Sequence, residues 1–263
     1  MSLKNKNAVV YGATGSVGGA VARAFAREGA RVFLTGRDLC AVDALAKEIS
    51  AAGGAAETAR VDALDEEAVE SHLDAVVRQG GTVDVSFNAI GIPQQGIQGI
   101  PLTELPVESF ALPIATYTQA HFLTARAAAR RMVRQRSGVI LMHTPEPARL
   151  GFPLVGGMGP AWAALEGLNR ALSAEYARYG VRAVCLRTSG LPETPTIDVV
   201  FGLHAEAQGI TPEQFAAFAA GLSHRRQATT LRELANVAAF VASDQAAAMT
   251  GTVANLTGGQ IVD

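Results

Sequence analysis

Short runs of apolar residues alternate with longer amphipathic stretches along the 263-residue chain. The short runs are rich in β-branched and aromatic residues and predict strands at 7–11, 31–35, 57–61, 83–89, 138–143, 181–187 and 252–257. The longer stretches repeat their apolar positions with a helical period and predict helices at 17–28, 38–52, 65–79, 117–135, 159–179 and 231–243. Strands and helices that alternate in this way form parallel sheets through right-handed crossovers. We therefore predict an α/β fold, a doubly wound parallel sheet in three layers with about seven strands.

One segment, 189–228, departs from this alternation. It has prolines at positions 192, 195 and 212 and predicts two short helices. Because it follows the sixth predicted strand, we expect a lid or pocket wall, with a plain surface insertion as the alternative. We find no linker or repeat, so residues 1–263 are expected to form a single nucleotide-binding domain.

The first predicted strand leads into a glycine-rich turn and then a helix, in the sequence VVYGATGSVGGAVARAF. Gly12 permits a tight turn, Gly15 lets the backbone approach a pyrophosphate, and Gly18 lets the helix pack against the strand. The helix N-terminus offers free N–H groups and the positive end of its dipole. This context predicts a dinucleotide site in a Rossmann fold.

The second predicted strand ends in FLTGRD, where NAD-specific sites usually have a carboxylate for the ribose 2′-hydroxyl. Here Gly36 is followed by Arg37, and a guanidinium suits a 2′-phosphate through forked, charge-assisted hydrogen bonds. The sequence therefore favours NADP(H) as cofactor. A solvated surface arginine beside Asp38 is the alternative.

Composition and charge limit the classes of partner that we expect for this protein. The net charge of −2 gives no electrostatic reason to expect a nucleic acid or an anionic membrane, and no apolar run has the length of a membrane span. Cys40 and Cys185 have no metal-binding or redox-motif spacing and are expected to be reduced thiols. The N-terminus begins at once with a predicted strand and leaves no room for a signal peptide, so we expect a cytoplasmic protein. No cluster of side chains has metal-ligand spacing, so we expect no metal site.

With these residues in view, the chain resembles the short-chain dehydrogenase/reductase family along nearly its whole length. YGATGSVG resembles the nucleotide loop of the family, FNAIG its motif after the fourth strand, and TGTVANLTGG its last strand and turn. The resemblance implies coenzyme contacts from a set of residues spread along the chain: Gly12, Thr14, Gly15, Ser16, Val17, Gly18, Asp62, Ala63, Asn88, Ala89, Gly91 and Thr194. Asp62 corresponds to an aspartate that contacts adenine, and Thr194 to a residue near the pyrophosphate or carboxamide.

The family's catalytic residues do not carry over. The family uses Asn, Ser, Tyr and Lys, and an alignment without gaps through ALEGL places Tyr117, Pro145, Met158 and Trp162 at these four positions. In the family, the lysine lowers the pKa of the tyrosine that moves the proton. Met158 and Trp162 provide instead an adaptable apolar wall, and an indole also attracts cations. The site is therefore either inactive or rebuilt for another substrate.

Three residues are candidates for the missing acid–base group. Glu146 follows the fifth predicted strand, where ligands bind, although a surface pair with Arg149 is equally open. Thr144 offers a hydroxyl in place of the serine. Tyr117 offers a hydrogen bond but is a poor base without a nearby cation, and it also fits a packed helix residue. His143 ends a strand, and we expect it to face the sheet packing.

These observations favour an NADP(H)-dependent oxidoreductase with a non-standard site, reducing an imine or another small carbonyl-like substrate. A protonated imine accepts hydride without a further proton in the same step. The alternatives are an inactive NADP(H)-binding or partner-binding protein and a lyase or isomerase on the same fold. The resemblance also implies a homotetramer or homodimer, for which small residues on two helices are suited: Ala125, Ala127, Ala128, Ala163 and Ala164.

Overall fold

The computed structural model describes residues 1–262. Seven strands form one sheet in the order β3-β2-β1-β4-β5-β6-β7, and every neighbouring pair is parallel. The strands are β1 (Asn7–Tyr11), β2 (Arg31–Gly36), β3 (Ala55–Arg60), β4 (Val85–Asn88), β5 (Gly138–Pro145), β6 (Val181–Thr188) and β7 (Thr252–Leu256). The order reverses between β1 and β4, as in a doubly wound sheet. The predicted fold class is therefore confirmed.

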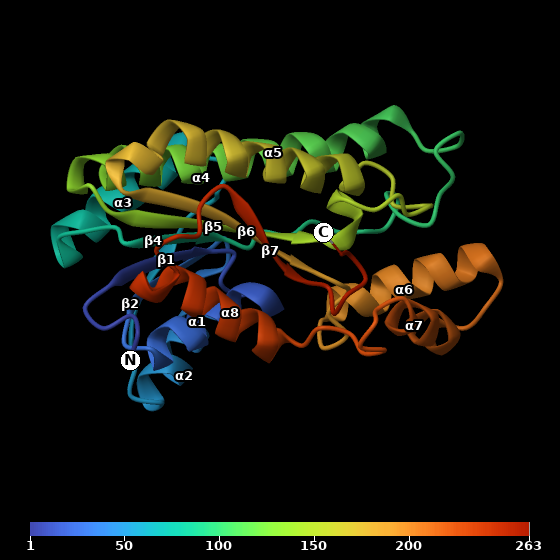
Figure 1. Ribbon diagram of the computed structural model, residues 1–263, viewed down its shortest axis with the longest axis horizontal. Coiled ribbons are helices and arrows are strands. Elements are labelled where there is room, and N and C mark those ends of the chain that lie inside the picture. Colours follow the sequence, from blue (N-terminus) through green and yellow to red (C-terminus); the bar gives the residue numbers. More distant parts are fainter. Residues whose placement is uncertain (263) are drawn as a thin grey trace.

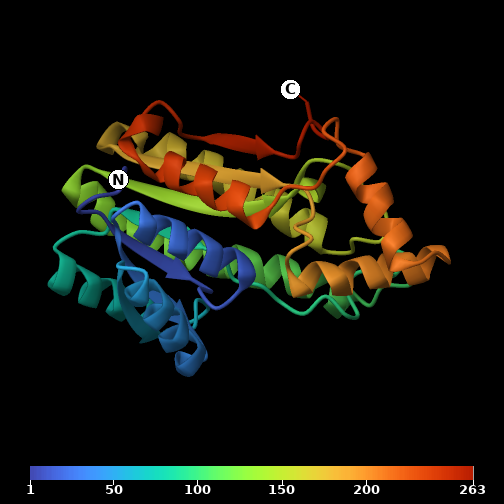
Figure 2. The same cartoon turned by 90° about the horizontal axis from the view of Figure 1, so that it is seen from below.

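Helices cover both faces of the sheet (Figure 1). One face carries α3 (Glu66–Gly80), α4 (Val107–Gln135) and α5 (Met158–Tyr176), and the other carries α1 (Ser16–Arg27), α2 (Leu39–Ala51) and α8 (Leu231–Ala242). Two further helices, α6 (Pro195–Gln208) and α7 (Pro212–Gly221), lie beyond one edge of these layers (Figure 2). Three short 3-10 turns, at Glu146–Ala148, Ala177–Tyr179 and Asp244–Ala246, complete the described elements.

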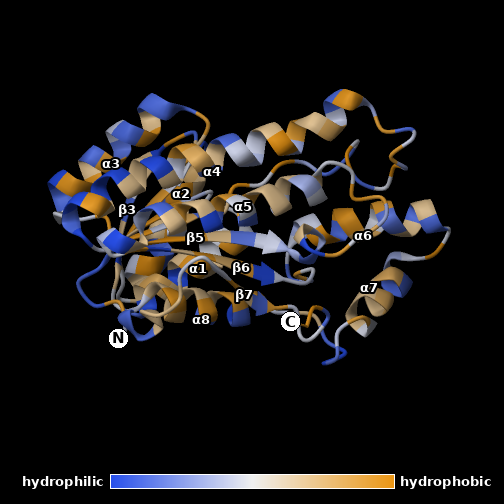
Figure 3. Ribbon diagram, turned by 45° about the horizontal axis from the view of Figure 1, so that its top comes forward, coloured by the Kyte–Doolittle hydropathy of each residue, from blue (hydrophilic) through white to orange (hydrophobic). Residues whose placement is uncertain are grey.

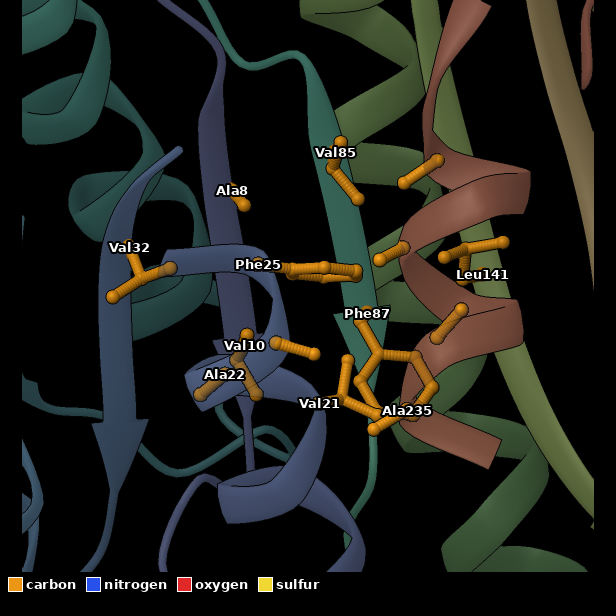
Figure 4. Close-up of a cluster of buried hydrophobic side chains, with 14 of the residues drawn as sticks. Ala8, Val10, Val21, Ala22, Phe25, Val32, Val85, Phe87, Leu141 and Ala235 are labelled. Atoms are coloured by element: carbon orange, nitrogen blue, oxygen red, sulfur yellow. The ribbon is translucent and has the colours of Figure 1, made fainter. Parts of the chain in front are cut away.

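Apolar side chains alternate between the two faces of each central strand. In β1, Ala8 and Val10 belong to the cluster that contains α1 and α8, whereas Val9 and Tyr11 belong to the cluster on the other face. Figure 4 shows the first cluster, with Phe25 of α1 packed beside β1 and β4. Both faces are buried, so these strands read as continuous apolar runs. Figure 3 shows the result, with hydrophobic strands inside and hydrophilic outer helix faces.

Helix α4 begins ten residues earlier than the sequence predicts. It starts at Val107 instead of residue 117 and contains Pro113, which reads locally as a break because proline has no N–H to donate. The early turns are held by packing against the start of α5. Gly157 touches them so closely that a Cβ there would overlap the carbonyl of Phe110 and lie 2.9 Å from Pro113 Cγ. Tertiary contact therefore outweighs the local signal.

Segment 189–228 contains the two short helices that its sequence predicts, α6 and α7. Each begins with a proline at its first position and a threonine cap, Thr194 for α6 and Thr211 for α7. Elsewhere, Cys40 and Cys185 are both free, as expected. Among residues 1–262, no helix combines the length and apolar character that crossing a bilayer requires.

The structure corrects part of the prediction that small residues on two helices form a subunit interface. Ala125, Ala127 and Ala128 are at most 2% exposed and pack in the core against the protein's own sheet. They let α4 approach the sheet closely and are not available to a partner. Ala163 and Ala164 of α5 are exposed. Small residues on a helix mark a close contact but do not say which surface makes it.

A buried ion pair joins α5 to the centre of the sheet. Arg187 of β6 donates to Glu166 of α5 twice, from Nε to Oε1 at 2.8 Å and from a terminal nitrogen to Oε2 at 2.6 Å. Thr144 of β5 donates its hydroxyl to Glu166 Oε1 at 3.1 Å. Both charged side chains are less than 10% exposed. This forked arrangement satisfies both carboxylate oxygens in a dry interior.

Removing one partner of this pair will be costly. Glu166→Ala leaves the Arg187 charge buried without compensation, and we expect the free energy of unfolding to fall by about 3–5 kcal/mol. Denaturant titration measures this change. Glu48→Ala is the matched control, because it breaks the exposed Arg23–Glu48 pair and is expected to cost about 0–1 kcal/mol. Equal losses in the two variants would contradict the structural role of the buried pair.

Candidate active site

A cavity lies at the carboxyl ends of the central strands, the edge where ligands bind in open α/β sheets. Its lining comes from the loop after β1, the ends of β4, β5 and β6, the start of α5, and both helices of segment 189–228. In Figure 1, α6 and α7 lie at this edge of the sheet. Segment 189–228 therefore forms part of the cavity wall.

The glycine loop has the geometry of a dinucleotide cradle. Gly12 has φ +67, and a Cβ there would lie 2.8 Å from the carbonyl oxygen of Ala89. A Cβ on Gly18 would overlap the carbonyl of Gly12. Helix α1 starts at Ser16 with Gly15 as its N-cap, and no side chain caps its free N–H groups. The loop residues Gly15, Ser16 and Val17 line the cavity. This arrangement fits the phosphates of a dinucleotide.

The end of β2 presents a free guanidinium near this loop. Arg37 is exposed and has no ion pair within residues 1–262. The neighbouring Asp38 caps α2, because its carboxylate accepts the N–H of Ala41 at 3.2 Å. Gly36 faces Thr14, whose methyl carbon would lie 3.7 Å from a Cβ added to the glycine. Asp38 is thus occupied by its own helix, while Arg37 is available to a ligand.

Two further strand ends carry predicted coenzyme residues. After β3, exposed Asp62 accepts the N–H of Leu64 at 3.0 Å, and Ala63 is buried. At the end of β4, Asn88 donates to Thr124 of α4 at 3.0 Å and accepts the N–H of Ile90 at 3.1 Å. The side chain of Asn88 therefore fixes the loop, and the loop residues Asn88, Ala89, Ile90 and Gly91 line the cavity.

Thr194 stands where segment 189–228 enters the cavity wall. Its hydroxyl donates to the carbonyl of Leu191 at 2.9 Å and accepts the N–H of Ile197 at 3.3 Å. Thr194 lines the cavity, as do Leu191 and Ile197. Its hydroxyl is used to start α6, so its contribution to a ligand is the position it gives to this turn.

The four aligned catalytic positions come together around the same cavity. Tyr117 of α4, Pro145 of β5, and Met158 and Trp162 of α5 all line it. Met158 is fully buried, and Trp162 is 9% exposed. Burial raises the pKa of Tyr117 to about 12, partly offset by a hydrogen bond with the backbone of Ile92. Tyr117 is therefore no base at neutral pH.

Glu146 follows β5 and lines the cavity. Its Oε2 atom is buried and has no hydrogen-bond partner within residues 1–262. It makes no ion pair with Arg149. Burial raises the pKa of its carboxyl group to about 7, and the backbone N–H groups of Glu146 and Gly190 offset part of this rise. The group is thus half-protonated near neutral pH, which suits an acid–base residue.

The structure corrects the expectation for His143. Its ring lines the cavity, with Nε2 2.9 Å from the hydroxyl of Thr188. Burial lowers its pKa to about 4, with a smaller contribution from His121. The alternation of side chains along a strand could have predicted this position, because residues 143 and 145 point to the same side of β5 and Pro145 also lines the cavity. His121 of α4 lines the cavity too, and burial lowers its pKa to about 4.

Comparisons with known proteins identify the family to which the chain belongs. Residues 12–260 match a family model described as enoyl-(acyl carrier protein) reductase. An uncharacterised oxidoreductase, YxbG, of Bacillus subtilis (strain 168) is 31% identical over 257 residues, which cover 98% of this chain and 91% of the relative. The chain belongs to the short-chain dehydrogenase/reductase family.

Solved structures with the same fold agree with this membership. A crystal structure of NAD⁺-bound xylitol dehydrogenase has a TM-score of 0.92 and 25% identity, and the match covers 98% of this chain and 100% of that one. A putative NAD(P)-dependent gluconate 5-dehydrogenase from Beutenbergia cavernae, with bound NADP at low occupancy, has a TM-score of 0.85 and 27% identity over 98% of each chain. Membership in the short-chain dehydrogenase/reductase family supports a nicotinamide cofactor and an oxidoreductase fold.

Thr144 does not face the site of this short-chain dehydrogenase/reductase. Its side chain is fully buried and donates to Glu166 on the other side of β5. Because neighbouring residues of a strand point to opposite faces, the hydroxyl is directed away from the cavity that Pro145 lines. Among residues 1–262, no three metal-binding side chains gather to hold an ion. Glu146 thus remains the candidate acid.

Proposed function

We propose that this protein is a cytoplasmic NADP(H)-dependent oxidoreductase that acts on a small molecule, with Glu146 as its acid–base group. A single observation carries the proposal: Glu146 lines the cavity with a buried, unpartnered Oε2 atom and a pKa raised to about 7. A proton on this oxygen is available at neutral pH. The site in this proposal lacks the tyrosine–lysine pair of the family, whose positions hold Met158 and Trp162.

The remaining wall suits a flat, apolar substrate that becomes cationic. Trp162 and Met158 lie within four residues at the start of α5, and both line the cavity beside Phe152. An indole face attracts a cation, and a thioether adapts to irregular shapes. The coenzyme, when bound, supplies or accepts a hydride. An imine fits these groups better than a ketone, because a carboxyl group with a pKa of about 7 can protonate an imine nitrogen before hydride transfer but cannot protonate the far less basic oxygen of a ketone.

Glu146 has two tasks in such a reduction. Its carboxyl group gives the proton on Oε2 to the nitrogen of a neutral imine, and the resulting carboxylate then stabilises the cation beside it. In the reverse direction the amine first gives its hydride to the coenzyme, and the carboxylate then takes the proton from the resulting iminium nitrogen. Burial strengthens this charge interaction, because little water competes with it. Solvent restores the proton on Glu146 after each turnover.

We propose NADP(H) as the preferred cofactor because Arg37 is free while Asp38 caps α2. An available guanidinium suits a 2′-phosphate, and an occupied carboxylate does not suit the ribose 2′-hydroxyl of NAD(H). The residues that the family resemblance assigns to the coenzyme remain part of this proposal, with Asp62 near the adenine and Thr194 near the pyrophosphate or carboxamide. Thr144 does not.

We also propose that the protein acts as a homotetramer or homodimer. Large apolar side chains are exposed on α4, among them Leu112 at 51% and Phe122 at 47%. Together with the exposed Ala163 and Ala164 of α5, they offer an apolar surface on the two helices that the family resemblance associates with subunit contact. Contact between such surfaces removes apolar area from water.

Replacing Glu146 will test its acid–base role. Glu146→Gln keeps the shape but can neither give nor take a proton. With 3,4-dihydroisoquinoline as a model imine, we expect NADPH-dependent turnover to fall about 100- to 10,000-fold. In the unaltered protein, reduction is expected to weaken as pH rises through about 7, where Glu146 loses its proton, and amine oxidation to strengthen. Steady-state rates across pH measure both effects.

Controls separate this result from its alternatives. Glu206→Gln removes the same charge from an exposed position on α6, outside the cavity, and is expected to leave the rates unchanged. Unchanged turnover in Glu146→Gln would contradict the assignment of the acid. NADPH binding without turnover of any imine or carbonyl compound would favour a non-catalytic binding protein. Turnover without any change in coenzyme redox state would favour a lyase or isomerase.

A second prediction concerns the cofactor. Arg37→Ala is expected to weaken NADPH binding by about 1.5–3 kcal/mol, because a hydrogen bond to a charged group is lost. NADH lacks the 2′-phosphate, so its affinity should hardly change. Titration calorimetry with both coenzymes gives the two values. An equal loss for NADPH and NADH would rule out a 2′-phosphate contact.

A further inference from the structure

No side chain in the cavity lining carries a positive charge that could neutralise an anionic substrate. Within residues 1–262 none of its lining residues is Lys or Arg. Its three histidines are neutral at pH 7, because burial lowers the pKa of His121, His143 and His204. Glu146 is the acidic side chain in the lining. A buried carboxylate or phosphate would find no cationic side chain there and would meet the partial charge of Glu146.

One part of the wall is nevertheless polar. Gln94 and Gln98, from the loop between β4 and α4, and His204 of α6 all line the cavity and are at most 4% exposed. They form a chain of hydrogen bonds. His204 Nε2 lies 3.0 Å from Gln98 Oε1, Gln98 Nε2 donates to Gln94 Oε1 at 2.7 Å, and Gln94 Nε2 donates to the carbonyl of Ile92 at 2.6 Å.

The direction of this chain is fixed at one end. A backbone carbonyl only accepts, so Gln94 must turn its amide nitrogen to Ile92 and its oxygen to Gln98. Gln98 must then donate to Gln94 and turn its own oxygen to His204. His204 must therefore carry its proton on Nε2. The chain thus has one possible arrangement, and His204 holds the amide of Gln98 in it.

This arrangement leaves donors free. Each primary amide has two N–H hydrogens, and one of each is used within the chain. Gln94 and Gln98 therefore each keep one N–H, on buried side chains that line the cavity. A buried donor without an acceptor costs free energy, so this wall favours a ligand with an oxygen acceptor.

Packing holds this wall in place. A Cβ on Gly99 would lie 3.0 Å from the carbonyl oxygen of Leu203, so the loop and α6 are in close backbone contact. The ring of His204 stacks on Phe215 of α7, with centroids 5.2 Å apart. Tyr117, whose hydroxyl bonds to the backbone of Ile92, joins the far end of the chain to α4. The donors are therefore preorganised instead of mobile.

We propose that the substrate carries one uncharged oxygen acceptor on an apolar body, bound by the free N–H groups of Gln94 and Gln98, and that anionic substrates are excluded. His204 acts as a positioning residue for this contact. The inference rests on the proposed function only in placing the reacting carbon near Glu146. It names the substrate class more narrowly: a neutral or protonated nitrogen compound with a distal amide, ketone or similar group.

Equilibrium binding tests this assignment without turnover. The probes are tetrahydroisoquinoline, its ring carboxamide and its ring carboxylate, both substituted at the same aromatic carbon. Titration calorimetry with the NADP⁺-saturated protein is expected to rank the carboxamide about two- to tenfold tighter than the parent amine, as for one neutral hydrogen bond. The carboxylate is expected to bind more than tenfold weaker than the carboxamide, because its charge is buried without a partner.

Variants of Gln98 and His204 test whether these residues cause the tighter binding of the carboxamide. Gln98→Leu is expected to abolish the advantage of the carboxamide and to leave the parent amine unaffected. His204→Phe keeps an aromatic ring against Phe215 but removes the donor, so it should reduce the same advantage, and His204→Gln should restore part of it. Gln208→Leu, at an exposed position at the end of α6 and outside the cavity, is the matched control and should change nothing.

The outcomes are decisive in each direction. A carboxylate that binds as tightly as the carboxamide, an unchanged ranking in Gln98→Leu, or no binding of any probe would overturn the inference. The proposed function fails separately, through absence of NADPH oxidation with 3,4-dihydroisoquinoline at every pH. In that case the binding order still stands as evidence for the ligand class.

Discussion

The buried pair of Glu166 and Arg187 organises the segments that build the site. Thr144, which also donates to Glu166, comes directly before Pro145 and Glu146. Arg187 comes directly before Thr188, whose hydroxyl forms a hydrogen bond with His143. Glu166 lies one turn after Trp162 on α5. The pair therefore sets β5, β6 and α5 in register, and their next residues converge on one cavity. The Glu166–Arg187 ion pair on one side of the sheet thus positions the cavity residues at the ends of β5 and β6.

Glu166 and Glu146, which both lie near this point, have opposite environments. Glu166 has a guanidinium on both of its oxygens, whereas Glu146 has no cation and one oxygen without a partner. Burial without a neighbouring cation raises the pKa of Glu146 to about 7, although two backbone N–H groups offset part of the rise. The same low-dielectric interior thus makes one carboxylate structural and the other a proposed proton donor. Met158 and Trp162 line the same cavity as Glu146 and bring no charge to it.

Much of the fold follows from the sequence, and the reasons for the exceptions are physical. The central strands were predictable because strands buried on both faces read as short apolar runs, whereas the edge strands β3 and β7 are only partly buried. The start of α4 was not, because Pro113 hides a helix that packing against Gly157 maintains. Strand alternation would have placed His143 in the cavity and Thr144 behind it. The chain of Gln94, Gln98 and His204 joins residues 106 positions apart, which no local pattern reveals.

Glu146 is proposed to hold its proton up to neutral pH, and the titration of its carboxyl carbon can be observed directly. In protein labelled with ¹³C at the glutamate carboxyl groups, the Glu146 signal is identified by its loss in Glu146→Gln. Titration of this signal by NMR is expected to give a midpoint of about 7. A midpoint near the ordinary value of 4.5 would show that the group is already ionised at neutral pH and would contradict its role as the proton donor.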